Sequence, residues 1–132
     1  MSLNEALQGK AYPPVPFEVE EERVRAFAAA VAHVGGGVPP TFATAPEHAA
    51  GMANVIADPD LGLDLSKVLH GEQEYEWIRP LRSGETVTAE TVIESIRGRA
   101  AMRFLTLRTV LRDEAGETVV VARSTLIVRE GE

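Results

Sequence analysis

The side chains best suited to acid–base chemistry in this chain are its histidines, because imidazole exchanges a proton near neutral pH. His48 directly follows Glu47 in a segment rich in alanine, and His70 begins a segment of alternating residue types. His70, Glu47 and His48 are therefore the candidate catalytic residues. His33 is expected at the C-terminal end of a helix, where a cation is favoured.

A structural role is the alternative for each candidate. His70 either faces a pocket, where it could bind a substrate or a partner's catalytic group, or is a strand-end histidine satisfied by the backbone. Glu47 either has a chemical role or is a carboxylate that faces solvent near the positive end of a helix. The histidines lack the close spacing of metal ligands, so no metal site is predicted. The absence of cysteine excludes thiolate catalysis and cysteine-ligated metals.

Three arginines, Arg97, Arg99 and Arg103, cluster around a tight turn that is expected at residues 97–99. Guanidinium groups suit phosphate geometry, so these side chains could grip the phosphates of a ligand. The alternative is a solvated turn without a ligand. The three glycines at 35–37 do not follow a strand, so they are not expected to form a phosphate-binding loop.

The composition is that of one globular domain, residues 1–132, with 45% hydrophobic and 25% charged residues. The formal net charge of −7 repels nucleic acid and anionic membranes, so neither is an expected partner. No apolar run approaches the ~18–20 residues that a transmembrane helix needs, and the N-terminus lacks a secretory signal pattern. The cytoplasm is the expected location.

Two helices are expected in the first half of the chain, after an extended proline-rich segment at 12–17. The first covers residues 20–33 and ends at the glycines. Its apolar residues share one face at helical spacing, which predicts a buried stripe: Val24, Phe27, Ala28 and Val31. The second begins at Thr41 or Pro46 and ends at Ala57, and its many small residues would let a sheet approach closely.

Four antiparallel strands are expected in the rest of the chain, over residues 70–79, 86–96, 100–112 and 117–129. In the first strand, alternation places two sets of side chains on opposite faces: Gln73, Tyr75 and Trp77 on one, and Glu72, Glu74 and Glu76 on the other. The aromatic residues are expected in the core or at a dimer interface, and the glutamates in solvent or paired with arginines. Helices followed by strands indicate an α+β fold. A long free edge of such a sheet is a pairing hazard unless it is covered or used.

Several segments resemble the MaoC-like dehydratase N-terminal domain family: residues 38–43, 69–76, 79–87, 113–116 and 122–129. The resemblance covers nearly the whole chain, and residues 70–87 are its most specific part. It implies a hot-dog fold, in which a long curved antiparallel sheet wraps around a central small-residue helix. It also implies pairing of two such domains as a double hot-dog.

The resemblance implies action on acyl thioesters of coenzyme A or acyl carrier protein, with no further cofactor. The reaction would be reversible addition of water to a 2-enoyl thioester, giving an (R)-3-hydroxyacyl thioester. The candidate substrate-binding residues are Thr41, Phe42, His70, Arg97 and Arg99, with the arginines on the phosphates of coenzyme A.

Active members of the family carry an Asp and a His, five residues apart, in the segment that leads into the central helix. This chain has no Asp between Ala28 and Ala57, and His33 leads almost directly into the glycines. The longer family loop is therefore expected to be missing, together with the dyad that it would carry.

Three hypotheses follow. In the first, the chain is a subunit of an (R)-specific enoyl thioester hydratase or 3-hydroxyacyl dehydratase, as a homodimer or as a heterodimer with a dyad-bearing MaoC-like partner. In the second, it is an acyl-CoA thioesterase, since hot-dog thioesterases use a helical carboxylate, which here would be Glu47. In the third, it is a non-enzymatic module that binds acyl thioesters.

Overall fold

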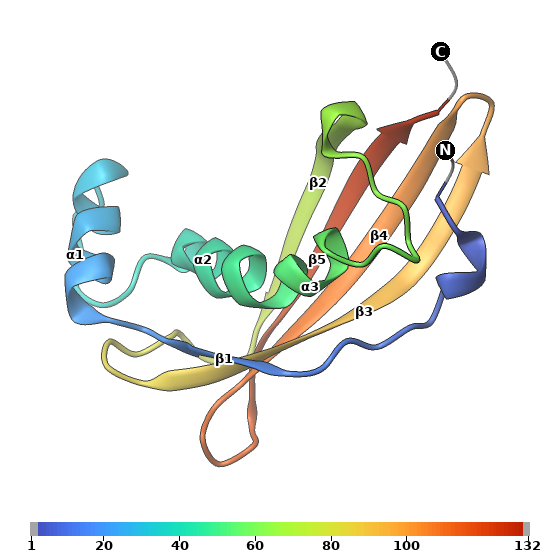
Figure 1. Cartoon of the computed structure of the whole chain (residues 1–132). Helices are drawn as coiled ribbons and strands as arrows, with labels where there is room; N and C mark the ends of the chain where they lie inside the picture. Colours follow the sequence, from blue (N-terminus) through green and yellow to red (C-terminus); the bar gives the residue numbers. More distant parts are fainter. Residues whose placement is uncertain (1–2, 131–132) are drawn as a thin grey trace.

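A five-stranded antiparallel sheet curves around one central helical segment, residues 40–56, in the computed structural model (Figure 1). The structure describes residues 3–130, apart from the side chain of Arg99. The sheet order is β1-β3-β4-β5-β2, with strands β1 (Val15–Glu18), β2 (Val68–Trp77), β3 (Thr86–Arg99), β4 (Met102–Arg112) and β5 (Thr118–Arg129). The expected α+β arrangement, a long antiparallel sheet around a small-residue helix, is confirmed.

The sheet has five strands where the sequence predicts four. The additional strand, β1, comes from the proline-rich segment and pairs with β3, with Pro16 opposite Thr88. Proline has no backbone N–H to donate, so it is tolerated on a strand at the edge of a sheet. β1 is such an edge strand, and β2 forms the opposite edge.

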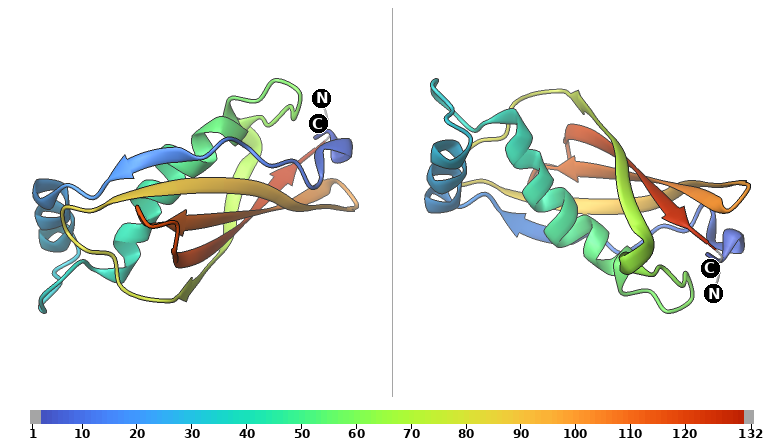
Figure 2. Two further views of the ribbon diagram at one scale, coloured as in Figure 1. Left: turned by 90° about the horizontal axis from the view of Figure 1, so that it is seen from below. Right: turned by 90° about the horizontal axis from the view of Figure 1, so that it is seen from above.

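The first helix, α1 (Glu21–Ala30), is shorter than predicted. It ends early because Ala32 adopts a left-handed backbone conformation with φ of 55°. The expected buried stripe is confirmed in part: Val24 is buried, and Phe27 and Ala28 are half-buried, with Phe27 packed against the core. Val31 lies past the end of the helix and is 49% exposed, so its place in the stripe is wrong. α1 stands at one end of the molecule and covers only that end of the sheet (Figures 1 and 2).

The central helix changes its winding along its length. It begins as a 3-10 turn (Pro40–Ala43), continues as α2 (Thr44–Pro46), widens into a π-helical turn (Glu47–Met52) and ends as α3 (Ala53–Ile56). Figure 2 shows that it crosses the concave side of the sheet obliquely. Gly51 is the point of closest approach, because a Cβ atom there would lie 2.5 Å from the Thr91 hydroxyl oxygen. The expectation that small residues allow this close approach is confirmed.

The space between helix and sheet holds two apolar clusters. One lies at the start of the central helix and includes Phe42 and Ala50, and the other lies at its end and includes Met52 and Val55. The buried polar residues of the described chain are Glu47, Thr91, Thr109 and Ser124. Between residues 3 and 130, no helix is long and apolar enough to cross a membrane.

Candidate active site

Glu47 lies at the centre of a buried polar cluster between the central helix and the sheet. Its side chain is 0% exposed. The Tyr75 hydroxyl donates to Oε1 at 3.0 Å, and the Gln73 amide donates to Oε2 at 3.0 Å. The alternative expectation for Glu47, a carboxylate facing solvent, is wrong. Glu47 shares the inner face of the helix with Ala43 and Ala50, which are also buried.

The sheet supplies the partners of Glu47 through strand alternation. Gln73 and Tyr75 are on the inner face of β2, as the sequence predicts, and Ser124 of β5 is directly opposite Gln73 in the register. The Ser124 hydroxyl oxygen lies 2.7 Å from Glu47 Oε2 and 2.6 Å from Gln73 Oε1. Since a hydroxyl has one proton, Ser124 can donate to only one of these oxygens at a time. Four side chains therefore form one connected network.

Burial and the adjacent carboxylate change the chemistry of Tyr75. Desolvation raises the pKa of the Tyr75 phenol, and the negative charge of Glu47 and the hydrogen bond to it raise that pKa further. The Tyr75 hydroxyl therefore keeps its proton and donates a hydrogen bond to Glu47. A buried carboxylate costs several kcal/mol of desolvation, which the donated hydrogen bonds offset in part.

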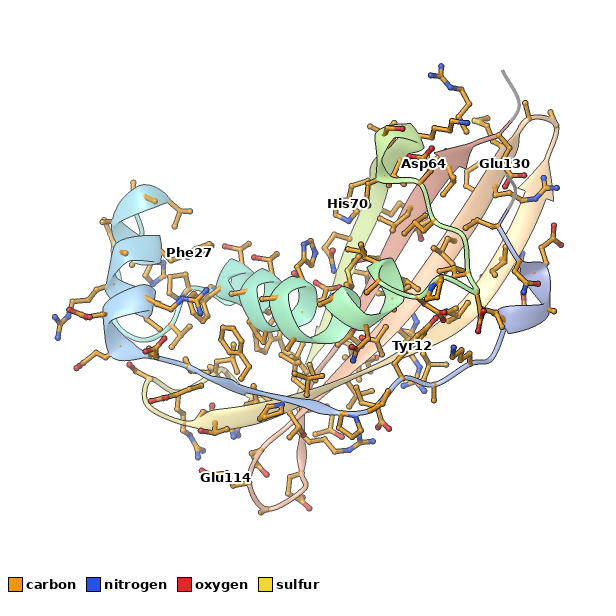
Figure 3. All side chains as sticks on the ribbon, in the orientation of Figure 1. Tyr12, Phe27, Asp64, His70, Glu114 and Glu130 are labelled. Carbon is orange, nitrogen blue, oxygen red and sulfur yellow. The ribbon has the colours of Figure 1, made fainter. Side chains whose placement is uncertain are left out.

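The two histidine candidates meet at the rim above this network. His48 Nε2 lies 3.6 Å from Glu47 Oε1, and the His48 side chain is 46% exposed. His70 is exposed on β2, and its ring stands edge-on to that of His48, with 6.1 Å between centroids. Figure 3 shows His70 on the side of β2 that faces the central helix. The structure thus brings together the three candidate catalytic residues.

The arrangement pairs two solvent-accessible imidazoles with one buried carboxylate. Imidazole is the side chain best suited to general acid–base chemistry, and a carboxylate beside it can orient the ring. Such a group can support general acid–base chemistry on a bound substrate. Glu47 itself has no exposed surface, and both of its oxygens are engaged. Within the described chain, no three His, Asp or Glu residues are placed to hold a metal ion.

The candidates that precede Glu47 in the central helix have different surroundings. Phe42 is only 2% exposed and packs edge-on against the rings of Phe17 and Phe27. The structure therefore makes Phe42 a core residue, with almost no surface for a ligand. Thr41 is exposed, and its carbonyl oxygen accepts a hydrogen bond from the Thr44 hydroxyl.

The expected arginine turn at residues 97–99 is wrong. These residues continue β3, opposite β4, and the turn lies at Ala100, whose φ is 54°. Arg103 forms ion pairs with Glu5 at 2.9 Å and Glu130 at 3.4 Å, so it is occupied by the chain itself. Arg97 is exposed on β3 opposite Phe104 of β4, and the side chain of Arg99 lies outside the described part.

An apolar pocket of about 230 Å³ lies at the start of the central helix. Its lining comes from the segment before the helix and from the end of β2: Val38, Pro40, Trp77, Ile78, Arg79, Pro80 and Leu81. Trp77 in the pocket lining lies seven positions after His70 along β2. At about 3.3 Å per position, the pocket is roughly 20 Å from the histidine pair. The sequence did not predict this pocket, because its two walls lie far apart in the chain.

Residues 32–122 match the family model described as "FAS1-like, dehydratase domain region". A UPF0336 protein of Streptomyces coelicolor is 38% identical over 149 residues, which take in 100% of this chain and 99% of the relative. Since this chain has 132 residues, at least 17 of those 149 aligned positions contain no residue of it.

Two solved structures share the fold. One is a chain of the HadBC (3R-hydroxyacyl-ACP dehydratase) complex from Mycobacterium tuberculosis, with a TM-score of 0.79 and 23% identity, covering 92% of this chain and 96% of that one. The other is a MaoC-like dehydratase with a TM-score of 0.78 and 26% identity, covering 96% of this chain and 43% of that one. These matches confirm the hot-dog fold and the resemblance to MaoC-like dehydratases.

Proposed function

Because the chain belongs to the FAS1-like, dehydratase domain region family, we propose that it is a subunit of an acyl thioester hydratase or dehydratase. It would act on a 2-enoyl or (R)-3-hydroxyacyl group carried by coenzyme A or acyl carrier protein, without a further cofactor. The observation that carries the proposal is the meeting of His48 and His70 at an open rim, above a buried carboxylate, in a domain of this family.

A partner subunit would supply the Asp–His dyad. This chain has no Asp between residues 28 and 57, and only nine residues connect α1 to the central helix. The aligned positions that this chain lacks are consistent with a shortened segment here. In the reaction, the partner's base takes a proton from water while the water oxygen adds to C3. The C2=C3 electron pair moves to C2 and onto the thioester carbonyl, and C2 then accepts a proton, for which His70 at the open rim is the proposed donor.

Pairing would use the free edge of β2. This strand is the last in the sheet order and pairs only with β5 within the chain. A long unpaired edge offers backbone donors and acceptors to another strand. Pairing with an equivalent strand would form a double hot-dog, either with a second copy or with a different chain. His48 and His70 lie beside this edge, so they would face a reaction groove that the two subunits share.

The apolar pocket would receive the acyl chain. Its walls are mainly aliphatic and aromatic, and Trp77 at the end of β2 is part of them. Apolar surface that leaves water on binding stabilises such a complex by about 25 cal/mol per Å². Replacement of Trp77 by alanine would enlarge the pocket and shift the preference toward longer chains.

The test is an enoyl thioester hydration assay with and without a dyad-bearing MaoC-like partner, using crotonyl-CoA and loss of the enoyl absorbance. We expect no turnover by this chain alone and turnover by the complex. In the complex, His70→Gln should lower kcat by about 10²-fold or more, the usual contribution of an acid–base group. His33→Gln, on the segment after α1, is the matched control and should leave the rate unchanged.

Other outcomes would contradict the proposal and identify an alternative. Hydration by the chain alone would show that it carries its own catalytic residues. Release of free coenzyme A, abolished by Glu47→Ala, would favour the thioesterase, although the complete burial of Glu47 argues against its direct attack on a substrate. Binding of acyl-CoA without turnover in either setting would favour a non-enzymatic module.

A further inference from the structure

The free edge strand β2 carries a patterned row of side chains on the outer, convex face of the sheet. The row runs Leu69, Glu72, Glu74 and Glu76, all exposed, and the exposed Ile78 follows directly after the end of β2. The register between β2 and β5 assigns these β2 side chains to the outer face of the sheet. Leu69 is opposite Ile127 and Glu74 is opposite Arg123, and both of these β5 residues are on the outer side. Three carboxylates thus lie between two apolar residues that are 66% and 64% exposed.

The two arginines in register with the β2 glutamates on this face are already paired with another carboxylate. Arg123 and Arg108 both approach Glu94, at 3.2 Å and 3.7 Å, although Arg123 is the residue opposite Glu74. In the part of the chain that the structure describes, none of the three β2 glutamates forms an ion pair. The edge therefore presents unneutralised negative charge at alternate positions.

Self-pairing along this edge would oppose like charges. If two copies pair through β2 about a two-fold axis perpendicular to the sheet, both central helices lie on the same side of the joined sheet. Residues that oppose each other across the two β2 strands then lie on the same face. In the register centred on Glu74, Glu72 of one copy lies opposite Glu76 of the other, and Glu74 lies opposite its own copy. A shift of two residues in either direction still leaves two symmetry-related pairs of opposed glutamates. Like charges directly opposite across strands destabilise pairing.

We propose that the free edge of β2 selects a different chain, whose own edge strand carries lysine or arginine between two apolar residues, and disfavours a second copy of this chain. The inference rests on the proposed function only in taking β2 as the pairing edge. Three opposed glutamate pairs should weaken self-association by about 3- to 100-fold at low salt. A basic partner strand would turn the same three positions into attractive pairs.

The test uses the chain itself as the basic partner. The triple variant E72K/E74K/E76K changes exposed side chains only and moves the formal net charge from −7 to about −1, because each Glu→Lys change adds two charges. A 1:1 mixture of wild type and this variant should form a hybrid dimer at least about tenfold tighter than either homodimer, by sedimentation velocity. Raising the salt from low to high concentration should weaken the hybrid.

The matched control is E20K/E21K/E22K, which makes the same charge change at the exposed start of α1. A mixture of this control variant with wild type should form a hybrid dimer no tighter than either homodimer. The inference is overturned if the control hybridises equally, if the wild-type homodimer is as tight as the hybrid, or if neither mixture dimerises. If the complex with the dyad-bearing partner hydrates the substrate but the charge variants do not change pairing, the proposed function is supported and this inference is overturned. If the charge variants change pairing but no complex hydrates the substrate, this inference is supported and the proposed function is overturned.

Discussion

Removal of the Glu47 carboxylate is expected to destabilise the fold because it leaves the Tyr75 hydroxyl without an acceptor. In Glu47→Ala, Tyr75 loses its hydrogen bond, whereas the Gln73 amide keeps the Arg123 carbonyl and the Ser124 hydroxyl keeps Gln73 Oε1. A buried donor left unpaired costs about 1–3 kcal/mol, and Tyr75 is half-buried, so the lower part of that range applies. A small cavity adds to the loss, and release of the desolvated charge subtracts from it. We expect a decrease of about 1–2 kcal/mol in the free energy of unfolding.

Urea unfolding followed by circular dichroism measures this change, and a double-mutant cycle isolates the interaction. Glu47→Ala removes the acceptor, because a glutamine at this position could still accept through its amide oxygen, and Tyr75→Phe removes only the donor hydroxyl. A hydrogen bond to a charged group contributes about 1.5–3 kcal/mol when buried, so the coupling energy at this half-buried tyrosine should be about 1–2 kcal/mol. In the control cycle with Tyr12→Phe, whose hydroxyl donates to Asp58 instead, the two changes should be additive within about 0.5 kcal/mol.

Two results would refute this reasoning. A coupling energy near zero between Glu47 and Tyr75 would show that the two groups do not interact in solution. A more stable Glu47→Ala protein would show that the desolvation cost of the carboxylate exceeds the stabilisation from its hydrogen bonds. In either case the network could not hold His48 in place, and Glu47 would lose its assigned part in the site.

Three further changes test other parts of the structure. Gly51→Ala should lower the free energy of unfolding by about 1–3 kcal/mol because its Cβ would overlap Thr91, whereas Gly36→Ala, which meets nothing within 4 Å, should change it by less than about 0.5 kcal/mol. Hydrogen bonds from Lys10 and Tyr12 lower the pKa of Asp58 to about 2, so its stabilising effect is complete above its ordinary value of 3.8 and is lost as the pH falls toward 2. Asp58→Asn should therefore flatten the acid decline of the thermal midpoint, and an unchanged decline would contradict this assignment. The pKa of Tyr75 is raised above 10.0, so its contribution is complete below pH 10 and is lost at higher pH, and Tyr75→Phe should remove part of the alkaline decline.

The sequence by itself determined the features that depend on local geometry. Strand alternation has a period of two, so the two faces of β2 were correctly separated, with Tyr75 and Trp77 on the inner side and the three glutamates on the outer side. The small residues of the central helix predicted its close approach to the sheet, because that approach depends on side-chain size at each position. The resemblance of residues 70–87 indicated the hot-dog fold, which the comparisons confirm.

Only the tertiary structure decided which way Glu47 points and what it contacts. Its partners come from strands 26 to 77 residues further along the chain, and a helix pattern alone does not specify which polar residue is buried against them. The pairing of β3 with β4 likewise moved the arginine turn, because continued strand pairing outweighed the local preference of Gly98 for a turn. His48 and His70 meet for the same reason: the curvature of the sheet, set by long-range pairing, brings the edge strand beside the helix that it surrounds.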